Sequence, residues 1–136
     1  MSFALDQRLV NDTFIVDESE QCLLLLMNDS QYDWFIVVPK YDDASEWHHL
    51  PATLQTELHG FCVELGEKIK DQLNADKINI AALGNVVSQL HVHVIGRKHT
   101  DPAWPGPVWG AHSPVPYSES EKQTVINQLN WPKLPF

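Results

Sequence analysis

The chain has 136 residues, of which 43% are apolar and 20% charged, and its formal net charge is −9 at neutral pH. A chain of this length and composition can bury the core of one folded domain, which excludes an intrinsically disordered protein. Because so acidic a surface repels polyanions, we also expect no binding to DNA or RNA.

The N-terminal segment and the cysteines bear on cellular location. Residues 1–6 show no basic start and no long apolar stretch, so no secretory signal is expected. The apolar run at residues 23–27 is too short to cross a bilayer, so we expect no membrane contact. Cys22 and Cys62 lie in apolar stretches and are expected to be buried thiols rather than a disulfide. Together these features favour the cytoplasm.

The first part of the chain predicts one short helix and three strands. We expect a helix at residues 5–10 and strands at residues 13–16, 22–27 and 34–38. The second of these strands is apolar throughout, which predicts burial on both faces of the sheet. Polar residues at 17–20 and 28–31 have turn chemistry, so the second and third strands should form a hairpin.

A long amphipathic helix follows the third strand. Its apolar residues recur at three- and four-residue steps, which places them on one face of the helix. They are Leu50, Leu54, Leu58, Phe61, Cys62, Leu65, Ile69 and Leu73. Pro51 suits the first helical turn, where its missing N–H costs nothing, and residues 74–76 end the helix.

The remaining elements are two strands, a coil and a short helix. The strands are expected at residues 78–83 and 90–95. A proline-rich coil with two tryptophans follows, and a helix is predicted at residues 118–129 because Ser118 and Glu121 form a capping box.

The order of these elements predicts the fold class. Strands dominate and one long helix precedes the last two, which indicates an α+β fold with an antiparallel sheet. We expect a single domain over residues 1–136, in which residues 97–136 form an irregular C-terminal extension that contains the short helix.

The strand at residues 90–95 carries the most informative chemistry. Because side chains alternate along a strand, Gln89, His91 and His93 should share one face, and the apolar residues between them should pack on the core. Residues two apart lie roughly 6.5 Å from each other, which suits a phosphate and its neighbouring groups. A neutral imidazole, with an unperturbed pKa of about 6.5, can attack phosphorus while its neighbour donates to a phosphate oxygen.

Two other interpretations of a His-x-His pair stay open at this point. The histidines could simply face solvent, or they could be two ligands of a zinc ion. Zinc would need a third ligand from His99, His112 or a carboxylate, and no spacing selects one of them. We therefore expect neither a metal nor another cofactor.

Residues 84–97 resemble the active-site strand of the histidine triad (HIT) family. The family motif is His-φ-His-φ-His-φ-φ, where φ is apolar, and His91 and His93 match its second and third histidines. Residues 25–28 and 35–40 resemble the nucleotide-binding hairpin of the family, and residues 104–106 (Trp-Pro-Gly) resemble a segment after the triad in one branch. The resemblance extends from about residue 20 to residue 106, and the long helix falls where the family has one.

The sequence departs from the family pattern at four positions. Gln89 replaces the first histidine of the triad, and Trp34 stands where the family usually has a histidine. Asn85 replaces the usual Gln, and Val86 replaces a frequent Ser or Thr. The chain thus resembles a variant branch, similar to bacterial HIT-type dinucleoside polyphosphate hydrolases. Because the strands that carry Trp34 and Gln89 should be neighbours, we expect these two replacements to be coupled.

The resemblance implies roles for the catalytic residues. His91 would attack the α-phosphate of a nucleotide and form a covalent nucleotidyl intermediate, which water would then open to release a nucleoside monophosphate. His93 would contact phosphate oxygens. Gln89 cannot titrate, so it could orient a phosphate or a histidine but not act as an acid or base.

It also implies residues that bind the substrate. Asn28 would reach the ribose hydroxyls, Asn79 would approach the phosphate or the ribose, and Asn85 and Trp104 would contact the substrate. For each asparagine the alternative is hydrogen bonding within a turn or an edge strand. For Trp104, and for Trp109 beside it, the alternative to covering a base or a partner subunit is packing within the coil.

The function implied by the resemblance is hydrolysis or transfer at a nucleotide α-phosphate. The leading substrate classes are dinucleoside polyphosphates, such as diadenosine tetraphosphate, and nucleoside phosphoramidates. The family also implies a homodimer. Two alternatives remain, namely a nucleotide-binding module with little turnover and a metal-dependent enzyme that uses His91 and His93 as ligands.

Overall fold

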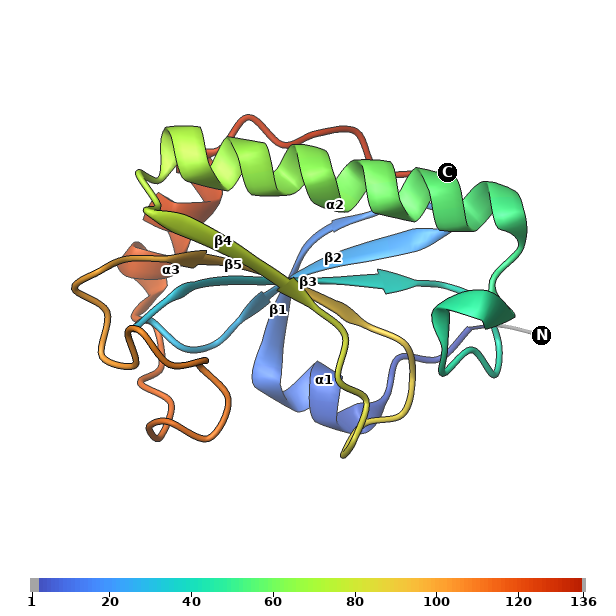
Figure 1. Cartoon of the computed structure of the whole chain (residues 1–136), viewed down its shortest axis with the longest axis horizontal. Helices are drawn as coiled ribbons and strands as arrows, with labels where there is room; N and C mark the ends of the chain where they lie inside the picture. The colour runs from blue at the N-terminus through green and yellow to red at the C-terminus, as the bar shows by residue number, and fades with distance from the viewer. Residues whose placement is uncertain (1–2, 136) are drawn as a thin grey trace.

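A computed structural model describes residues 3–135 of the chain. Its centre is a five-stranded antiparallel sheet with the strand order β1-β2-β3-β5-β4 (Figure 1). The strands are β1 (Thr13–Glu18), β2 (Cys22–Met27), β3 (Asp33–Pro39), β4 (Lys77–Ala81) and β5 (Val92–Arg97). The helices are α1 (Gln7–Asp12), the short 3-10 helix η1 (Trp47–His49), α2 (Ala52–Gln72) and α3 (Glu119–Gln128). The predicted α+β class, with one long helix and a short C-terminal helix, is confirmed.

The face of the sheet that packs on α2 holds the larger core (Figure 1). The predicted apolar stripe of α2 is buried there, including Leu58, Leu65 and Ile69, which are fully inaccessible to solvent. Helix and sheet approach closely at Gly96 of β5, where an added Cβ would lie 2.6 Å from Ile69 Cγ2. The C-terminal segment closes the same core, because Leu129 and Leu134 are both buried in it.

The opposite face of the sheet is covered by two irregular segments instead of a helix bundle. Phe3 and Leu5 of the N-terminal segment, Leu9 of α1, and Val108 and Trp109 of the coil after β5 pack on it. A sheet that is covered on both sides explains the unbroken apolar run of β2 and the burial of nearly all of β3. The predicted hairpin of β2 and β3 is present, with Leu24 opposite Val37.

Several predicted boundaries shift in the structure. The first helix begins at Gln7 because the Asp6 side chain caps it by accepting from Arg8 N, and β1 continues into the predicted turn as far as Glu18. The strand expected from residue 90 begins only at Val92, and the strand expected to reach residue 83 ends at Ala81. The segment that carries Gln89 and His91 therefore precedes β5 and does not belong to it.

Both cysteines are buried free thiols, as expected from their apolar neighbours. Burial raises the pKa of each thiol to about 12, so neither is a ready nucleophile. Within residues 3–135, no helix is both long and apolar enough to cross a membrane.

Candidate active site

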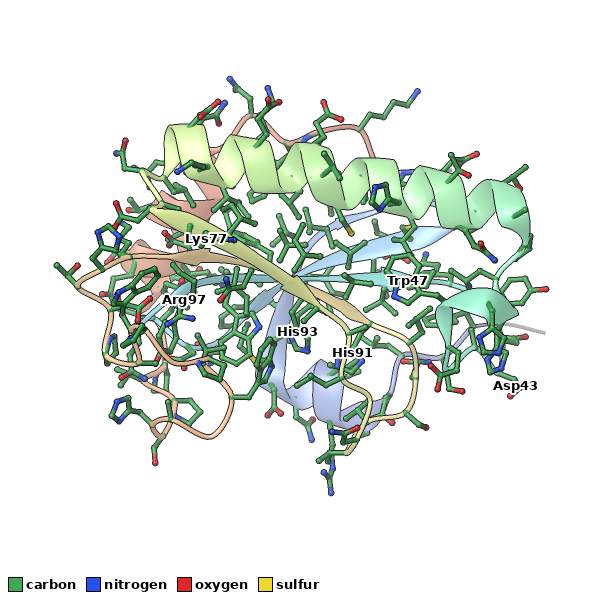
Figure 2. All side chains as sticks on the ribbon, in the orientation of Figure 1. Asp43, Trp47, Lys77, His91, His93 and Arg97 are labelled. Atoms are coloured by element: carbon green, nitrogen blue, oxygen red, sulfur yellow. The ribbon has the colours of Figure 1, made fainter. Side chains whose placement is uncertain are left out.

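His91 and His93 lie next to each other on the face of the sheet opposite α2 (Figure 2). His93 belongs to β5, where it pairs with Ile36 of β3 and Ala81 of β4, and His91 stands one residue before the strand begins. Their ring centroids are 5.0 Å apart and the rings meet edge to face. Both are largely buried, with exposed fractions of 7% and 4%. The predicted pairing of these two imidazoles on one face is thus present.

The two histidines line a cavity of about 390 Å³. Its walls are mostly apolar, and Arg8 and Asp12 of α1 are its two oppositely charged residues. The other lining residues are Leu9, Met27, Trp34, Leu83, Gly84, Asn85, Val86, Val87 and Trp109. A concave, mostly apolar space with a few convergent polar groups is typical of a small-molecule site.

A backbone carbonyl fixes the proton of His91. His91 Nδ1 lies 2.7 Å from the Gln89 carbonyl oxygen. A carbonyl can only accept a hydrogen bond, so Nδ1 carries the proton and donates it. In the neutral ring Nε2 then keeps its lone pair, which is the state that a nucleophilic imidazole needs.

An indole fixes the proton of His93 in the opposite sense. Trp34 Nε1–H donates to His93 Nδ1 over 2.9 Å, so the neutral ring of His93 carries its proton on Nε2. Burial, with a smaller contribution from the neighbouring His91, lowers the pKa of His93 to about 3. His93 is therefore a neutral hydrogen-bond donor at any physiological pH, next to a lone pair on His91.

The side chain of Gln89 points to the N-terminal segment and does not line the cavity. Its Oε1 accepts from Asp6 N at 2.8 Å, and its Nε2 donates to Ala4 O at 2.9 Å. Only the backbone carbonyl of Gln89 reaches a catalytic candidate, His91. We expected this amide to orient a phosphate or a histidine. In the structure its carbonyl and one N–H are instead bonded to backbone groups of the N-terminal segment.

Gln89 and Trp34 also differ from the coupled pair that we expected. Trp34 bonds to His93, whereas the Gln89 amide bonds to Ala4 and Asp6. Within the described residues no hydrogen bond joins Gln89 to Trp34. Each replacement therefore has its own structural partner.

Only one of the three predicted asparagines lies at the cavity. Asn85 lines it. Asn28 Oδ1 accepts from Tyr117 N at 2.9 Å, and thereby ties the C-terminal segment to the end of β2. Asn79 Oδ1 accepts from Arg97 Nη1, also at 2.9 Å. For Asn28 and Asn79 the local hydrogen-bonding alternative describes the structure better than contact with a ligand.

Trp109, rather than Trp104, reaches the histidines. Its ring packs edge to face on His93 with centroids 5.1 Å apart, and it lines the cavity. Trp104 packs instead on His99, with centroids 4.8 Å apart, and on the Arg97 guanidinium. The two tryptophans lie in the same irregular coil, where no periodicity indicates which of them points inward.

Arg97 anchors the coil that carries Trp109, a role that was not predicted from the sequence. The side chain is only 2% exposed and forms a bidentate pair with Asp101, at 2.8 and 3.0 Å. It also donates to Asn79 Oδ1 and to the Gly106 carbonyl. Burial alone would raise the pKa of Asp101, but the hydrogen bonds and charge of Arg97 and further bonds from backbone N–H groups bring it below its ordinary value. A basic residue at the end of an apolar strand was the one sequence signal for this anchor.

The geometry also bears on the metal interpretation. Among residues 3–135, no three His, Cys, Asp or Glu side chains come close enough together to hold a metal ion. His99 stacks on Trp104, and His112 Nε2 lies 3.1 Å from Pro102 O, so neither joins His91 and His93.

The chain is similar to known proteins along most of its length. The HIT domain family matches residues 8–100. A histidine triad protein from Marinobacter aquaeolei VT8 is 44% identical, with a TM-score of 0.91 over 94% of this chain and 93% of that chain. One from Bradyrhizobium japonicum is 37% identical, with a TM-score of 0.91 over 94% and 96%. A HIT protein from Sinorhizobium meliloti 1021 is 41% identical, with a TM-score of 0.89 over 93% of each chain. No curated protein matches significantly.

Proposed function

Because the chain belongs to the histidine triad (HIT) domain family, we propose that it is a nucleotide hydrolase or transferase in which His91 attacks the α-phosphate. The observation that carries the proposal is the bond from His91 Nδ1–H to the Gln89 carbonyl. It leaves the Nε2 lone pair of His91 available in a cavity of about 390 Å³, within the usual size range for small-molecule sites.

The reaction would proceed in two displacements at phosphorus. The Nε2 lone pair of His91 forms a bond to the α-phosphorus, and the bond from phosphorus to the leaving group breaks with its electron pair on the leaving group. A phosphate leaves as the anion, whereas an amine takes up a proton from solvent as it leaves. A water oxygen, or the acceptor in a transferase, then bonds to phosphorus. The N–P bond breaks, returns its electron pair to Nε2, and a proton passes to solvent.

His93 would assist without changing its charge. Its Nε2–H is fixed as a donor by Trp34, so it can donate to a non-bridging phosphate oxygen as negative charge develops there. A neutral donor suits this role because it stays in the same protonation state across the working pH range.

The apolar walls of the cavity would hold the nucleoside. Met27, Val87 and the Trp109 ring offer contact surface for a base, and Asn85 offers a hydrogen-bonding side chain. We propose dinucleoside polyphosphates, such as diadenosine tetraphosphate, and nucleoside phosphoramidates as the substrate classes. Gln89, Asn28, Asn79 and Trp104 would act on the site indirectly, through the segments that they hold.

The decisive experiment is a panel of adenosine and guanosine polyphosphates and phosphoramidates, assayed for release of the nucleoside monophosphate. Acid-quenched samples would be analysed by intact mass for a nucleotidyl adduct on His91. We expect both product and adduct with at least one substrate. If none gives a monophosphate or an adduct, the covalent route is wrong.

The same panel of substrates distinguishes two other functions. Nucleotide binding without product would favour a binding module, for which the non-titrating Gln89 in the first triad position is the supporting observation. Activity that is lost on chelation and restored by zinc would favour a metal-dependent enzyme. Each assay is therefore run with and without chelator.

A further inference from the structure

Trp34 donates its indole N–H to His93 from an enclosed position in β3. It lies in β3 opposite Ile95 of β5. Ile36, two residues further along β3 and on the same face, is the cross-strand partner of His93. The ring is 7% exposed and packs edge to face on both Tyr32 and Trp109. These contacts hold the ring in the orientation that points its Nε1–H at His93 Nδ1.

We propose that Trp34 is a positioning residue that holds His93 in the tautomer with the proton on Nε2. In this tautomer His93 is a hydrogen-bond donor, and His91 is left as the nucleophile. The catalytic role of this tautomer rests on the function proposed above. The tautomer itself can be measured without any substrate.

An indole fixes the tautomer of His93 more strictly than the histidine that the family usually has at this position would. Indole N–H is a donor only and does not titrate, whereas imidazole can donate, accept or become charged. Opposite an indole, Nδ1 of His93 has to accept. His91 is held by a carbonyl, which can only accept, so its Nδ1 has to donate. The two rings are thereby locked into opposite tautomers by partners that cannot exchange roles.

This lock has two chemical consequences. The Nε2 atom of His93 has no lone pair in the neutral ring, and its Nδ1 lone pair is occupied by Trp34, so His93 cannot replace His91 as the nucleophile. A second proton can enter His93 only by displacing the indole from Nδ1. The charged or titratable groups that share the cavity are His91 beside it and Arg8 and Asp12 of α1. Trp34 and Trp109 are uncharged, and so are Ile36 of β3 and Ala81 of β4, the two residues that pair with His93.

The test compares Trp34→Phe with a matched control, Trp131→Phe. The first variant keeps a buried ring but removes the N–H. The control removes an indole N–H that donates to the Ile126 carbonyl at 3.0 Å, in the core on the other face of the sheet. Thermal unfolding would show that both variants fold.

The first readout is the long-range ¹H–¹⁵N spectrum of the histidine rings. In the unmodified protein and in Trp131→Phe, we expect His93 to show a protonated Nε2, an unprotonated Nδ1 and no titration down to pH 5. In Trp34→Phe we expect a mixture of tautomers and a titration midpoint more than about one pH unit higher. A mixed or Nδ1-protonated His93 in the unmodified protein, or an unchanged spectrum in Trp34→Phe, would overturn the proposal.

The second readout is the pH dependence of turnover on the substrate that the panel identifies. For Trp34→Phe we expect kcat to fall about tenfold to a hundredfold, KM to change much less, and an acidic limb to appear in the pH profile of kcat. Trp131→Phe should keep the original kcat and profile. An unchanged kcat and pH profile in Trp34→Phe, with the tautomer changed, would remove the catalytic part of the proposal. If no substrate is turned over, the proposed function fails while the tautomer measurement still decides the structural part.

Discussion

His91 depends for its reactivity on a hydrogen bond to the backbone, not to another side chain. The Gln89 carbonyl supplies this bond whatever side chain residue 89 carries, so the glutamine at this position does not determine which nitrogen of His91 carries the proton. In the proposed reaction the imidazole itself cannot be replaced in this way, because its Nε2 would form the bond to phosphorus.

We therefore expect His91→Ala to abolish turnover and to leave nucleotide binding largely intact. Loss of a covalent nucleophile should lower kcat by about 10³-fold or more, since only binding and positioning remain. Initial rates and calorimetric titration with a non-hydrolysed analogue would measure the two effects. His59→Ala is the matched control, because His59 is exposed on α2, away from the cavity. More than a few per cent of residual activity in His91→Ala would exclude His91 as the nucleophile.

His93 should make the fold sensitive to acid. Its pKa is lowered to about 3 in the folded protein, whereas the pKa of an unfolded histidine lies near its ordinary value of 6.5. Between these two values the unfolded chain binds the extra proton. Stability is therefore complete above about pH 6.5 and falls as pH decreases toward 3, by at most about 1.4 kcal/mol per pH unit.

Urea denaturation at pH 7, 6, 5 and 4 would measure this dependence. Protonation of carboxylates with lowered pKa values, such as Asp101, also destabilises the folded protein in acid. The contribution of His93 is therefore isolated by comparison with His93→Gln. We expect a shallower decline in His93→Gln between pH 6 and 4. Parallel curves for the two proteins would show that His93 does not contribute.

Among the elements, the coil after β5 depends on one buried ion pair. Arg97 and Asp101 are 2% and 5% exposed, and the pair fixes the start of the segment that presents Trp109. We expect Asp101→Asn to destabilise the fold by about 3–5 kcal/mol, because it leaves the buried guanidinium without its counter-charge. Chemical denaturation would measure the loss. Glu119→Gln, which breaks the exposed pair with Lys122, is the control and should change little.

The N-terminal segment depends on Gln89 in a similar way. The Gln89 amide holds Ala4 and Asp6 through two hydrogen bonds, and removal of both should cost about 1–2 kcal/mol. We expect Gln89→Ala to accelerate amide hydrogen exchange at residues 4–6 without unfolding α2. Gln7→Ala is the control, because the Gln7 amide bonds only to Asn11 on an exposed face. Unaltered exchange at Asp6 in Gln89→Ala would show that the segment is held by its apolar contacts alone.

Periodic patterns of apolar residues predicted the helices and strands well, whereas the paths of the irregular segments could not be predicted. The stripe of α2 and the apolar run of β2 follow from local sequence, because burial on one face or two is encoded in the spacing of apolar residues. The roles of Trp109 and Gln89 do not follow from spacing. Each depends on where a coil or a terminus crosses the sheet, and that path is fixed by contacts between segments far apart in the sequence, such as Gln89 with Asp6.

The candidate site shows the same division. The adjacency of His91 and His93 could be predicted, because alternation places them on one face and the family motif marks them. Their opposite tautomers could not, since one depends on the cross-strand position of Trp34 and the other on a backbone carbonyl. Asn28 and Asn79 bond within the chain, and the sequence could not indicate this, because asparagine serves equally well in turns, at strand edges and at ligands.

For the whole molecule, we predict a homodimer. The supporting observations are the family membership and the open edge of β4, whose Ile80 is 46% exposed. An unpaired strand edge with an exposed apolar residue favours pairing with another chain. Light scattering at micromolar concentration should give about twice the chain mass of 15.5 kDa. A mass near that of one chain would leave each site to be formed by a single subunit.

The first and last described segments of the chain close opposite faces of the sheet, so trimming by exopeptidases would have different consequences at the two ends. Phe3 and Leu5 pack on the face that carries the histidines, whereas Leu129 and Leu134 pack in the core beneath α2. Trimming from the amino end would therefore disturb the surroundings of His91 while the main core stays closed. Trimming from the carboxyl end would open that core itself. An affinity tag faces the same asymmetry, since it is attached either near the chemistry or near the main source of stability.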